Sequence, residues 1–366
     1  MTMKTRYILM AALLAAASCT NTDYVDVDNV DPIMVVNAQL TTANTTHTVY
    51  LSASTLSQLQ EVTGADVLVS INGGPAIKAT EDTSDEEMYG NLYNASKYVF
   101  DYSFTAGDKV EIDVKNGSYL ITDASVTVPK DPVIKSVELL HNVPHSSSDS
   151  IFDWGGGGYY GPYIEDGDSP YPYNAWHELR VTLQDIPSED SYYRLDVEIV
   201  YTLQDGEEVE SGVSGVWVDT SSEPVLSTAA SSNGGLLDAL VEESNRYNAF
   251  SDNVFKDSEY TLKLFFQESS VSYMRNYYYV YDDTEWNYDE ESGKYVPTPL
   301  PDGVTYNSIM RVKLYSISHD QYIYLKALDL DDVAIFFSEP ISIPSNVNGG
   351  MGFITIDNCK EVTLEY

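Results

Sequence analysis

The side chains best suited to acid–base or nucleophilic chemistry are five histidines: His47, His141, His145, His177 and His319. Nucleophilic catalysis needs a base beside a serine or cysteine, and the sequence has no Gly-x-Ser-x-Gly turn that would present such a serine. His141 and His145 flank Pro144 in a predicted loop and could meet a metal ion, but no HExxH or Cys-x-x-Cys spacing accompanies them. We therefore predict no catalytic residue, no metal site and no cofactor.

Carboxylates dominate the charge of the chain, with 57 Asp and Glu against 19 Lys and Arg and a formal net charge of −38. Nucleic-acid binding depends on Lys and Arg meeting phosphates, so this balance excludes a nucleic-acid partner. Paired carboxylates can hydrolyse glycosidic bonds, but among so many acids close pairs arise by chance. Asp329, Asp331 and Asp332 lack the glycine and terminal glutamate of a calcium loop, so we interpret them as a solvated helix end.

Tyrosine is the outlier in composition, with 30 residues against 10 phenylalanines. The segment 154–173 has no strand or helix pattern, and segments of that kind are usually functional or disordered. The segment contains four consecutive glycines. The candidate ligand-binding residues are five tyrosines of the segment and the tryptophan that follows it: Tyr159, Tyr160, Tyr163, Tyr171, Tyr173 and Trp176. Such rings could stack on sugars or pack against peptide side chains. The alternative, equally open, is that they pack on their own domain.

The start of the chain predicts export and a lipid anchor. Lys4 and Arg6 precede an apolar run, residues 7–17, which is too short to span a bilayer and is typical of a secretory signal. Small residues then lead to Cys19, a pattern that resembles a bacterial lipobox, in which the cysteine becomes the lipid-bearing first residue. The alternative is an ordinary secretory signal with a chance cysteine. We expect residues 1–18 to be a signal peptide and residues 19–32 an acidic tether attached to lipid through Cys19.

The elements that follow predict a mainly β protein. Short alternating runs between residues 33 and 128 are joined by turn sequences at Asn72-Gly73 and Asn116-Gly117, which favour positive φ and therefore hairpins. Several short strands in about a hundred residues are typical of an immunoglobulin-like β-sandwich. We expect that sandwich over residues 33–131, with the Pro129–Pro132 stretch ending it.

Residues 132–366 are expected to form a larger β-rich C-terminal domain with two short helices. Asn233 could cap the first helix, which would have Leu236, Leu237, Leu240 and Val241 on one face. Ser318 and Gln321 have the spacing of a capping box for the second, in which each side chain bonds the other residue's backbone amide. Tyr322, Leu325 and Leu328 would then lie on the buried face of that helix.

Motifs near the C-terminus carry a family resemblance. The stretches 337–340 (Phe-Ser-Glu-Pro) and 344–352 (Pro-Ser-Asn-Val-Asn-Gly-Gly-Met-Gly) resemble the closing signature of a family of Bacteroidota lipoproteins, catalogued as a domain of unknown function numbered four-two-four-nine. Other short motifs of the family occur in the same order along the chain: residues 34–37, 128–129 and 250–252, and the capped helix at Ser318. The Gly/Tyr segment 154–173 departs from the pattern. Gly349-Gly350 and Asn346 favour a fold-closing turn over a ligand site.

The resemblance implies an outer-membrane lipoprotein at the cell surface, anchored through Cys19 and encoded beside TonB-dependent transporters. It supplies no catalytic residues. We expect a surface lipoprotein that is not an enzyme and acts as a binding or accessory component beside a TonB-dependent nutrient importer, with a glycan or peptide as its ligand. One alternative is a surface hydrolase that trims glycan or peptide polymers. A second alternative is a structural adhesin.

Overall fold

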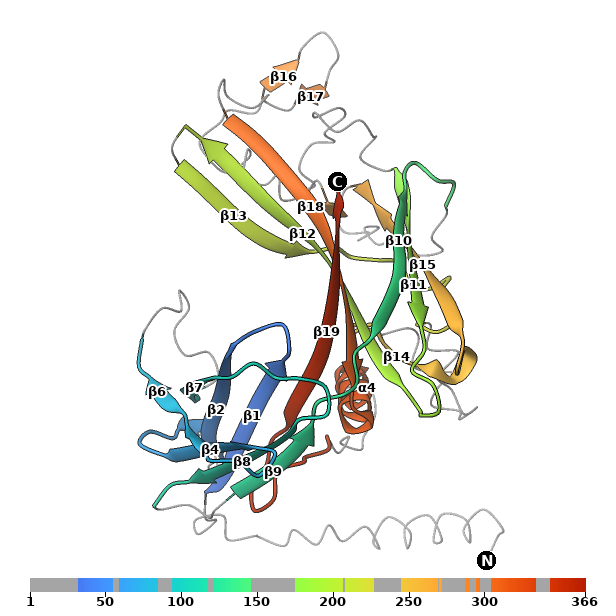
Figure 1. The fold of residues 1–366 in the computed structure, drawn as a ribbon. Helices are drawn as coiled ribbons and strands as arrows, with labels where there is room; N and C mark the ends of the chain where they lie inside the picture. Colours follow the sequence, from blue (N-terminus) through green and yellow to red (C-terminus); the bar gives the residue numbers. More distant parts are fainter. Residues whose placement is uncertain are drawn as a thin grey trace, which may run out of the picture.

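The structure is a computed structural model and is mainly β (Figure 1). It describes residues 32–54, 59–84, 94–117, 122–145, 175–206, 208–226, 245–268, 270–271, 287–289, 294–296, 304–333 and 343–366. Within these ranges, no helix combines the length and the apolar character that crossing a membrane requires. The second predicted helix is present, whereas the one predicted near Asn233 lies outside the described residues.

Two sheets form the predicted N-terminal sandwich. One contains β1 (Ile33–Thr41), β2 (Thr46–Ser54), β7 (Ser96–Asp101) and β6 (Thr80–Asp82) in that order, with β3 (Leu59–Glu61) also paired to β2. The other contains β5 (Ile77–Lys78), β4 (Asp66–Ile71), β8 (Lys109–Lys115) and β9 (Thr122–Thr127). These orders are those of the A-B-E-D and C′-C-F-G sheets of immunoglobulin domains.

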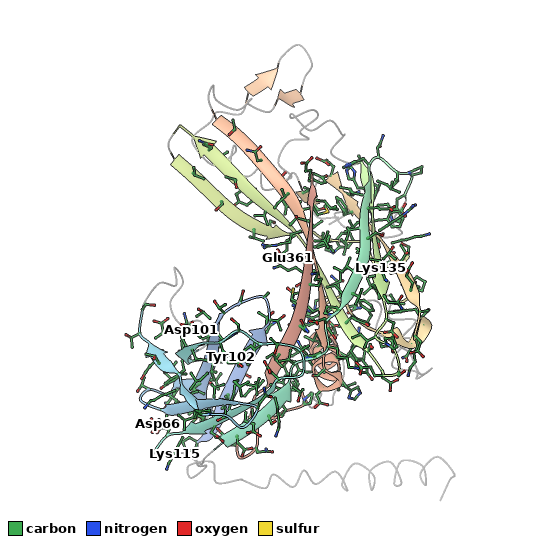
Figure 2. All side chains as sticks on the ribbon, in the orientation of Figure 1. Asp66, Asp101, Tyr102, Lys115, Lys135 and Glu361 are labelled. Atoms are coloured by element: carbon green, nitrogen blue, oxygen red, sulfur yellow. The ribbon has the colours of Figure 1, made fainter. Side chains whose placement is uncertain are left out.

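Simple alternation explains which residues fill this sandwich. In β1, every second residue from Met34 to Leu40 is buried, and the same period places Val110, Ile112 and Val114 of β8 in the shared core. Asn72 and Gly73 adopt φ of 53° and 68°, which confirms the turn predicted between β4 and β5. Asp66 and Lys115 are exposed and lie directly opposite each other on β4 and β8; both are labelled in Figure 2.

The C-terminal unit packs a small sheet against long strands. The small sheet contains β10 (Val133–Leu140), β11 (Trp176–Gln184) and β15 (Glu259–Gln267). Opposite it lie β12 (Tyr192–Asp205), β14 (Ala249–Ser251), β18 (Val304–Ile317) and β19 (Ile354–Glu365), and β13 (Glu208–Gly215) pairs with the second half of β12. Their shared core includes Leu179, Leu195 and Leu314, all fully buried. A 3₁₀ turn, η2 (Asp252–Val254), follows β14, and β16 (Asn287–Asp289) pairs with β17 (Lys294–Val296). Lys135 on β10 and Glu361 on β19 mark this unit in Figure 2.

Strand β19 belongs to both units. Its first residues pair in parallel with β1, from Ala38↔Ile354 to Thr41↔Asp357, and its remainder pairs antiparallel with β18. A single ten-stranded sheet therefore runs through the molecule, and Figure 1 shows β19 crossing from the sandwich to the second unit. Val347, Ile354 and Ile356 lie in the core of the sandwich. The sequence assigned the whole of residues 132–366 to the second domain, so that assignment is corrected for residues 347–357, while the boundary near residue 131 stays a prediction.

The segment before β19 closes the sandwich, as its glycines suggested. Asn348 exchanges backbone hydrogen bonds with Asp123 on β9, and Met351 does so with β1, donating to Met34 and accepting from Val36. Gly352 has φ of +111°, and a Cβ there would collide with the carbonyl of Val36. The side chain of Asn346 brackets the backbone of Ile354, accepting from its N–H at 2.8 Å and donating to its carbonyl at 2.7 Å. These contacts make the closing signature a structural element.

Helix α4 (His319–Val333) confirms half of the predicted capping box. The backbone N–H of Gln321 donates to Ser318 Oγ at 3.1 Å. The Gln321 side chain does not return to Ser318; its Nε2 donates to Asp357 Oδ1 on β19 at 2.5 Å. Leu325 is buried and Tyr322 half-buried, as the period predicted. The helix is thereby fixed to the strand that joins the two units.

Candidate functional site

Most of the predicted site lies outside the described residues. This applies to the lipidation site Cys19 and to Tyr159, Tyr160, Tyr163, Tyr171 and Tyr173. Trp176 is described, as the half-buried first residue of β11. The features that the structure does place are a histidine cluster around Trp176 and an exposed apolar face on a projecting arm.

Trp176 packs against His145. Their ring centroids are 4.6 Å apart at 69°, and the His145 ring also stacks on Phe265 at 4.0 Å and 3°. His145 Nε2 lies 2.9 Å from Asp219 Oδ2. Burial raises the pKa of Asp219, but the hydrogen bonds from His145 and Ser221 outweigh burial and hold that pKa below its usual value. Trp176 is therefore part of a packed histidine–aromatic group at the end of the small sheet.

A second histidine group lies next to the first. His141 Nδ1 and His177 Nδ1 are 3.1 Å apart, and His177 Nε2 lies 3.0 Å from Glu268 Oε2. Tyr366 Oη donates to the same Glu268 oxygen at 2.5 Å. His177 and Glu268 are 0% and 3% exposed, whereas His141 is exposed. Burial, with a smaller effect from His177, lowers the pKa of His141.

The carboxylate of Glu268 determines the protonation pattern of this group. An ionised carboxylate only accepts hydrogen bonds, so His177 Nε2 carries a hydrogen and, in the neutral ring, Nδ1 presents a lone pair toward His141. His141 and His145 thus pair with different groups rather than with each other. No set of three or more His, Cys, Asp or Glu able to hold a metal ion occurs among the described residues.

Sequence reasoning missed the pairing of His177 with Glu268. The residues lie on β11 and directly after β15, 91 positions apart, so no local spacing connects them. One signal was available: His177 shares a strand face with Leu179 and Val181 and is buried with them. A buried imidazole requires a hydrogen-bond partner, so the position of His177 in the strand could have indicated that it has a polar partner.

The other candidate surface lies on an arm formed by β12, β13 and β18, which extends beyond the small sheet (Figure 1). Val213, Val200 and Ile309 are aligned across its three strands. Val209 and Val213 on β13 are 63% and 54% exposed, and Ile309 is 40% exposed. Trp217, two residues after β13, is 48% exposed. We call Val209, Val213, Trp217 and Ile309 the arm patch.

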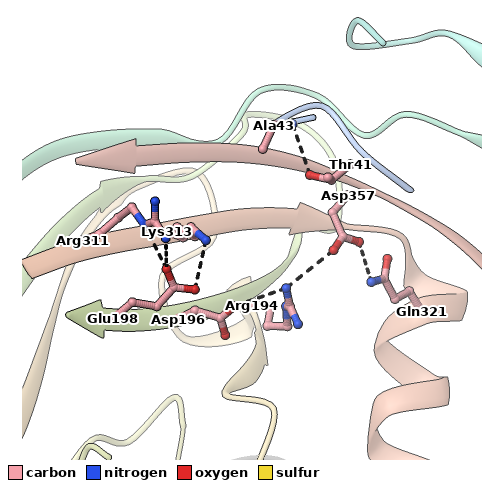
Figure 3. Close-up of polar contacts among 9 residues, drawn as sticks. All are labelled: Thr41, Ala43, Arg194, Asp196, Glu198, Arg311, Lys313, Gln321 and Asp357. Atoms are coloured by element: carbon pink, nitrogen blue, oxygen red, sulfur yellow. Dashed lines mark hydrogen bonds and ion pairs between the residues drawn. The ribbon is translucent and has the colours of Figure 1, made fainter. Parts of the chain in front are cut away.

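A row of ion pairs, the ion ladder, lies on the same face of the arm as Ile309, starting two residues along the same strands. Figure 3 shows these ion pairs. Arg311 donates through Nε and Nη2 to Glu198 Oε2 at 2.9 and 2.6 Å, and Lys313 Nζ lies 2.9 Å from Glu198 Oε1. Burial raises the pKa of Glu198, but Lys313 and Arg311 outweigh burial and hold it below its usual value. The ladder continues to Arg194, whose Nη2 lies 3.2 Å from Asp196 Oδ2 and 3.7 Å from Asp357 Oδ2.

These features describe a β protein with an immunoglobulin-like sandwich, a second β unit and an exposed apolar arm. The family model described as "Domain of unknown function (DUF4249)" matches residues 21–361, and the chain belongs to that family. The short motifs therefore predicted the catalogued domain of unknown function correctly. No curated protein matches the chain.

Proposed function

We propose that the protein is a surface lipoprotein, anchored to the outer membrane through Cys19, that serves as a binding or accessory component beside a TonB-dependent nutrient importer and is not an enzyme. The observation that carries the binding role is the arm patch. Large apolar side chains gathered on one face of a projecting sheet, with charges at their border, are typical of surfaces that dock another protein.

Burial energetics support docking at this face. Complete burial of a valine or isoleucine side chain is worth about 1.5–3 kcal/mol, and Val209, Val213 and Ile309 are still 63%, 54% and 40% exposed in the isolated chain. Trp217 adds an aromatic ring, a residue type enriched among interface hot spots. The ladder of Glu198, Arg311 and Lys313 supplies a polar rim. We assign the importer to the arm patch, and a glycan or peptide ligand to the tyrosines of segment 154–173.

Copurification with a single charge substitution tests this assignment. Val213→Glu places a carboxylate in the arm patch, at an exposed position where folding should tolerate it. We expect this variant, purified from detergent-solubilised membranes, to lose most of the copurifying importer. Ile323→Glu is the matched control, because Ile323 is 43% exposed on α4, away from the arm. Equal retention of the importer by both variants, with equal melting temperatures, would refute docking at the arm patch.

A structural adhesin is the second candidate, favoured by the position of β13. Among the described strands, β13 has β12 as its neighbour on one side and forms the edge of the ten-stranded sheet. An open edge can accept an added strand from another molecule. The adhesin account predicts self-association or cell adhesion that Val213→Glu abolishes, with no importer in the purified wild-type complex.

A further inference from the structure

We propose that His141 and His177 form a two-histidine site for a divalent transition-metal ion, with Glu268 as the positioning residue. This inference goes beyond the proposed docking role and does not depend on it. The site consists of two imidazole nitrogens within 3.1 Å of each other, and the second ring nitrogen of His177 contacts the buried carboxylate of Glu268.

The spacing of the two nitrogens fits coordination of one ion. His141 Nδ1 and His177 Nδ1 are 3.1 Å apart, and their ring planes are inclined at 81°. With metal–nitrogen bonds of about 2.0–2.1 Å, this separation corresponds to an N–metal–N angle of about 98°, between octahedral and tetrahedral values. No set of three or more His, Cys, Asp or Glu able to hold an ion occurs in the described part of the chain, so we propose the site with His141 and His177 as its two protein ligands.

The hydrogen bond from His177 to Glu268 is the kind that a metal-ligating histidine makes with its second ring nitrogen. Such a histidine almost always donates its second ring N–H to a carboxylate, carbonyl or water, which fixes its tautomer and raises its basicity. His177 Nε2 donates to Glu268 Oε2, and Tyr366 Oη donates to the same carboxylate oxygen. Because His177 and Glu268 are buried, this ring is held in place before any ion arrives.

His141 supplies the accessible side of the site. His141 directly follows β10 and its side chain is exposed, so an ion can approach it from solvent. Without metal, one hydrogen occupies the space between the two Nδ1 atoms. Binding requires His141 to carry its hydrogen on Nε2 instead, which is a change of tautomer in the neutral ring and consumes no proton. Imidazole ligands suit copper, nickel and zinc, and the general affinity order places Cu²⁺ first.

Calorimetric titration of the full chain with Cu²⁺, after chelator treatment and in a non-coordinating buffer, tests the site. We expect one ion per chain, and at least a tenfold weaker Kd for His141→Gln. Glu268→Gln should weaken Kd by about 10–100-fold, the range for loss of such a supporting partner. His319→Gln is the control, since His319 is a 60% exposed histidine on α4. Melting temperatures in chelator establish that each variant is folded.

Electron paramagnetic resonance of the wild-type Cu²⁺ complex tests the same site without any substitution. We expect hyperfine coupling to two imidazole nitrogens, reduced to one in His141→Gln. Three results would each overturn the proposal: no saturable binding by the wild type, unchanged affinity in His141→Gln, or an equal loss of affinity in His319→Gln. The copurification of the importer is independent of all three.

Discussion

At the scale of single residues, Gly352 shows how the closing signature constrains the fold. Its φ of +111° is unfavourable for any L side chain, and a Cβ there would meet the backbone of Val36. We expect Gly352→Ala to destabilise the protein by about 1–3 kcal/mol, the cost of holding a residue in such a conformation. Gly215→Ala is the control, because a Cβ at Gly215 meets nothing within 4 Å. Chemical denaturation of the two variants measures the difference, and equal stabilities would contradict this account of the turn.

The tyrosines of segment 154–173 give a prediction that separates binding from packing. If Tyr159, Tyr160 and Tyr163 contact a ligand, replacing all three with Ser should abolish glycan or peptide capture without changing the melting temperature. Each lost ring should weaken affinity by about 1–3 kcal/mol, on the scale seen for stacked aromatic residues. Capture by a glycan or peptide array, with melting followed in parallel, is the measurement. A lower melting temperature with capture intact would make the segment structural.

At the scale of elements, Asp357 links β19 to α4 and β12. It is 1% exposed, accepts from Gln321 and lies 3.7 Å from Arg194, with Asp196 also nearby (Figure 3). Burial raises the pKa of Asp357, with Arg194 and Gln321 opposing that effect. A raised carboxyl pKa means that the folded state binds the proton more tightly than the unfolded state. Asp357 therefore costs stability above its folded pKa, and this cost disappears as the pH falls toward its unfolded pKa.

We accordingly expect Asp357→Asn to be more stable than the wild type at pH 8. Each pH unit by which the pKa is raised corresponds to about 1.4 kcal/mol. The difference should shrink as the pH is lowered to 4, because the wild-type carboxyl becomes neutral. Urea denaturation across this range, with Asp113→Asn at an exposed position of β8 as control, checks the prediction. A difference that grows toward acid would show that the ionised carboxylate stabilises the fold.

The elements also show what the sequence could predict. Alternation and the Asn72-Gly73 turn identified strands of the sandwich, and the Ser318 spacing identified the start of α4, because these signals act over a few residues. The tight turn predicted at Asn116-Gly117 is wrong, since neither residue has a positive φ and β8 pairs with β9 in the register Val114↔Thr122. The parallel pairing of β19 with β1 joins opposite ends of the chain and leaves no local signal. The same is true of His177 and Glu268. Gln321 was assigned to the wrong partner, since the buried Asp357 carboxylate competes for its amide.

At the scale of the whole molecule, the C-terminal segment determines whether the sandwich is independent. The sequence predicts that residues 33–131 fold alone, but β1 has β19 as its second neighbour, and Val347, Ile354 and Ile356 complete the core. We expect residues 30–131 alone to aggregate or melt at a lower temperature. Joining residues 343–358 through a flexible linker should restore a cooperative transition. Dispersed amide resonances and a cooperative melt for residues 30–131 alone would contradict this dependence.

The measurement that tests the proposed function most directly is quantitative affinity purification of the wild-type protein from native membranes, with Cys19→Ala as the control for the proposed anchor. The account predicts that a TonB-dependent transporter is enriched with the wild type in near-equal amount. It also predicts that Cys19→Ala leaves the membrane fraction or remains unprocessed, and loses the transporter. A wild-type protein that stays in the outer membrane but purifies without any transporter would contradict the central claim.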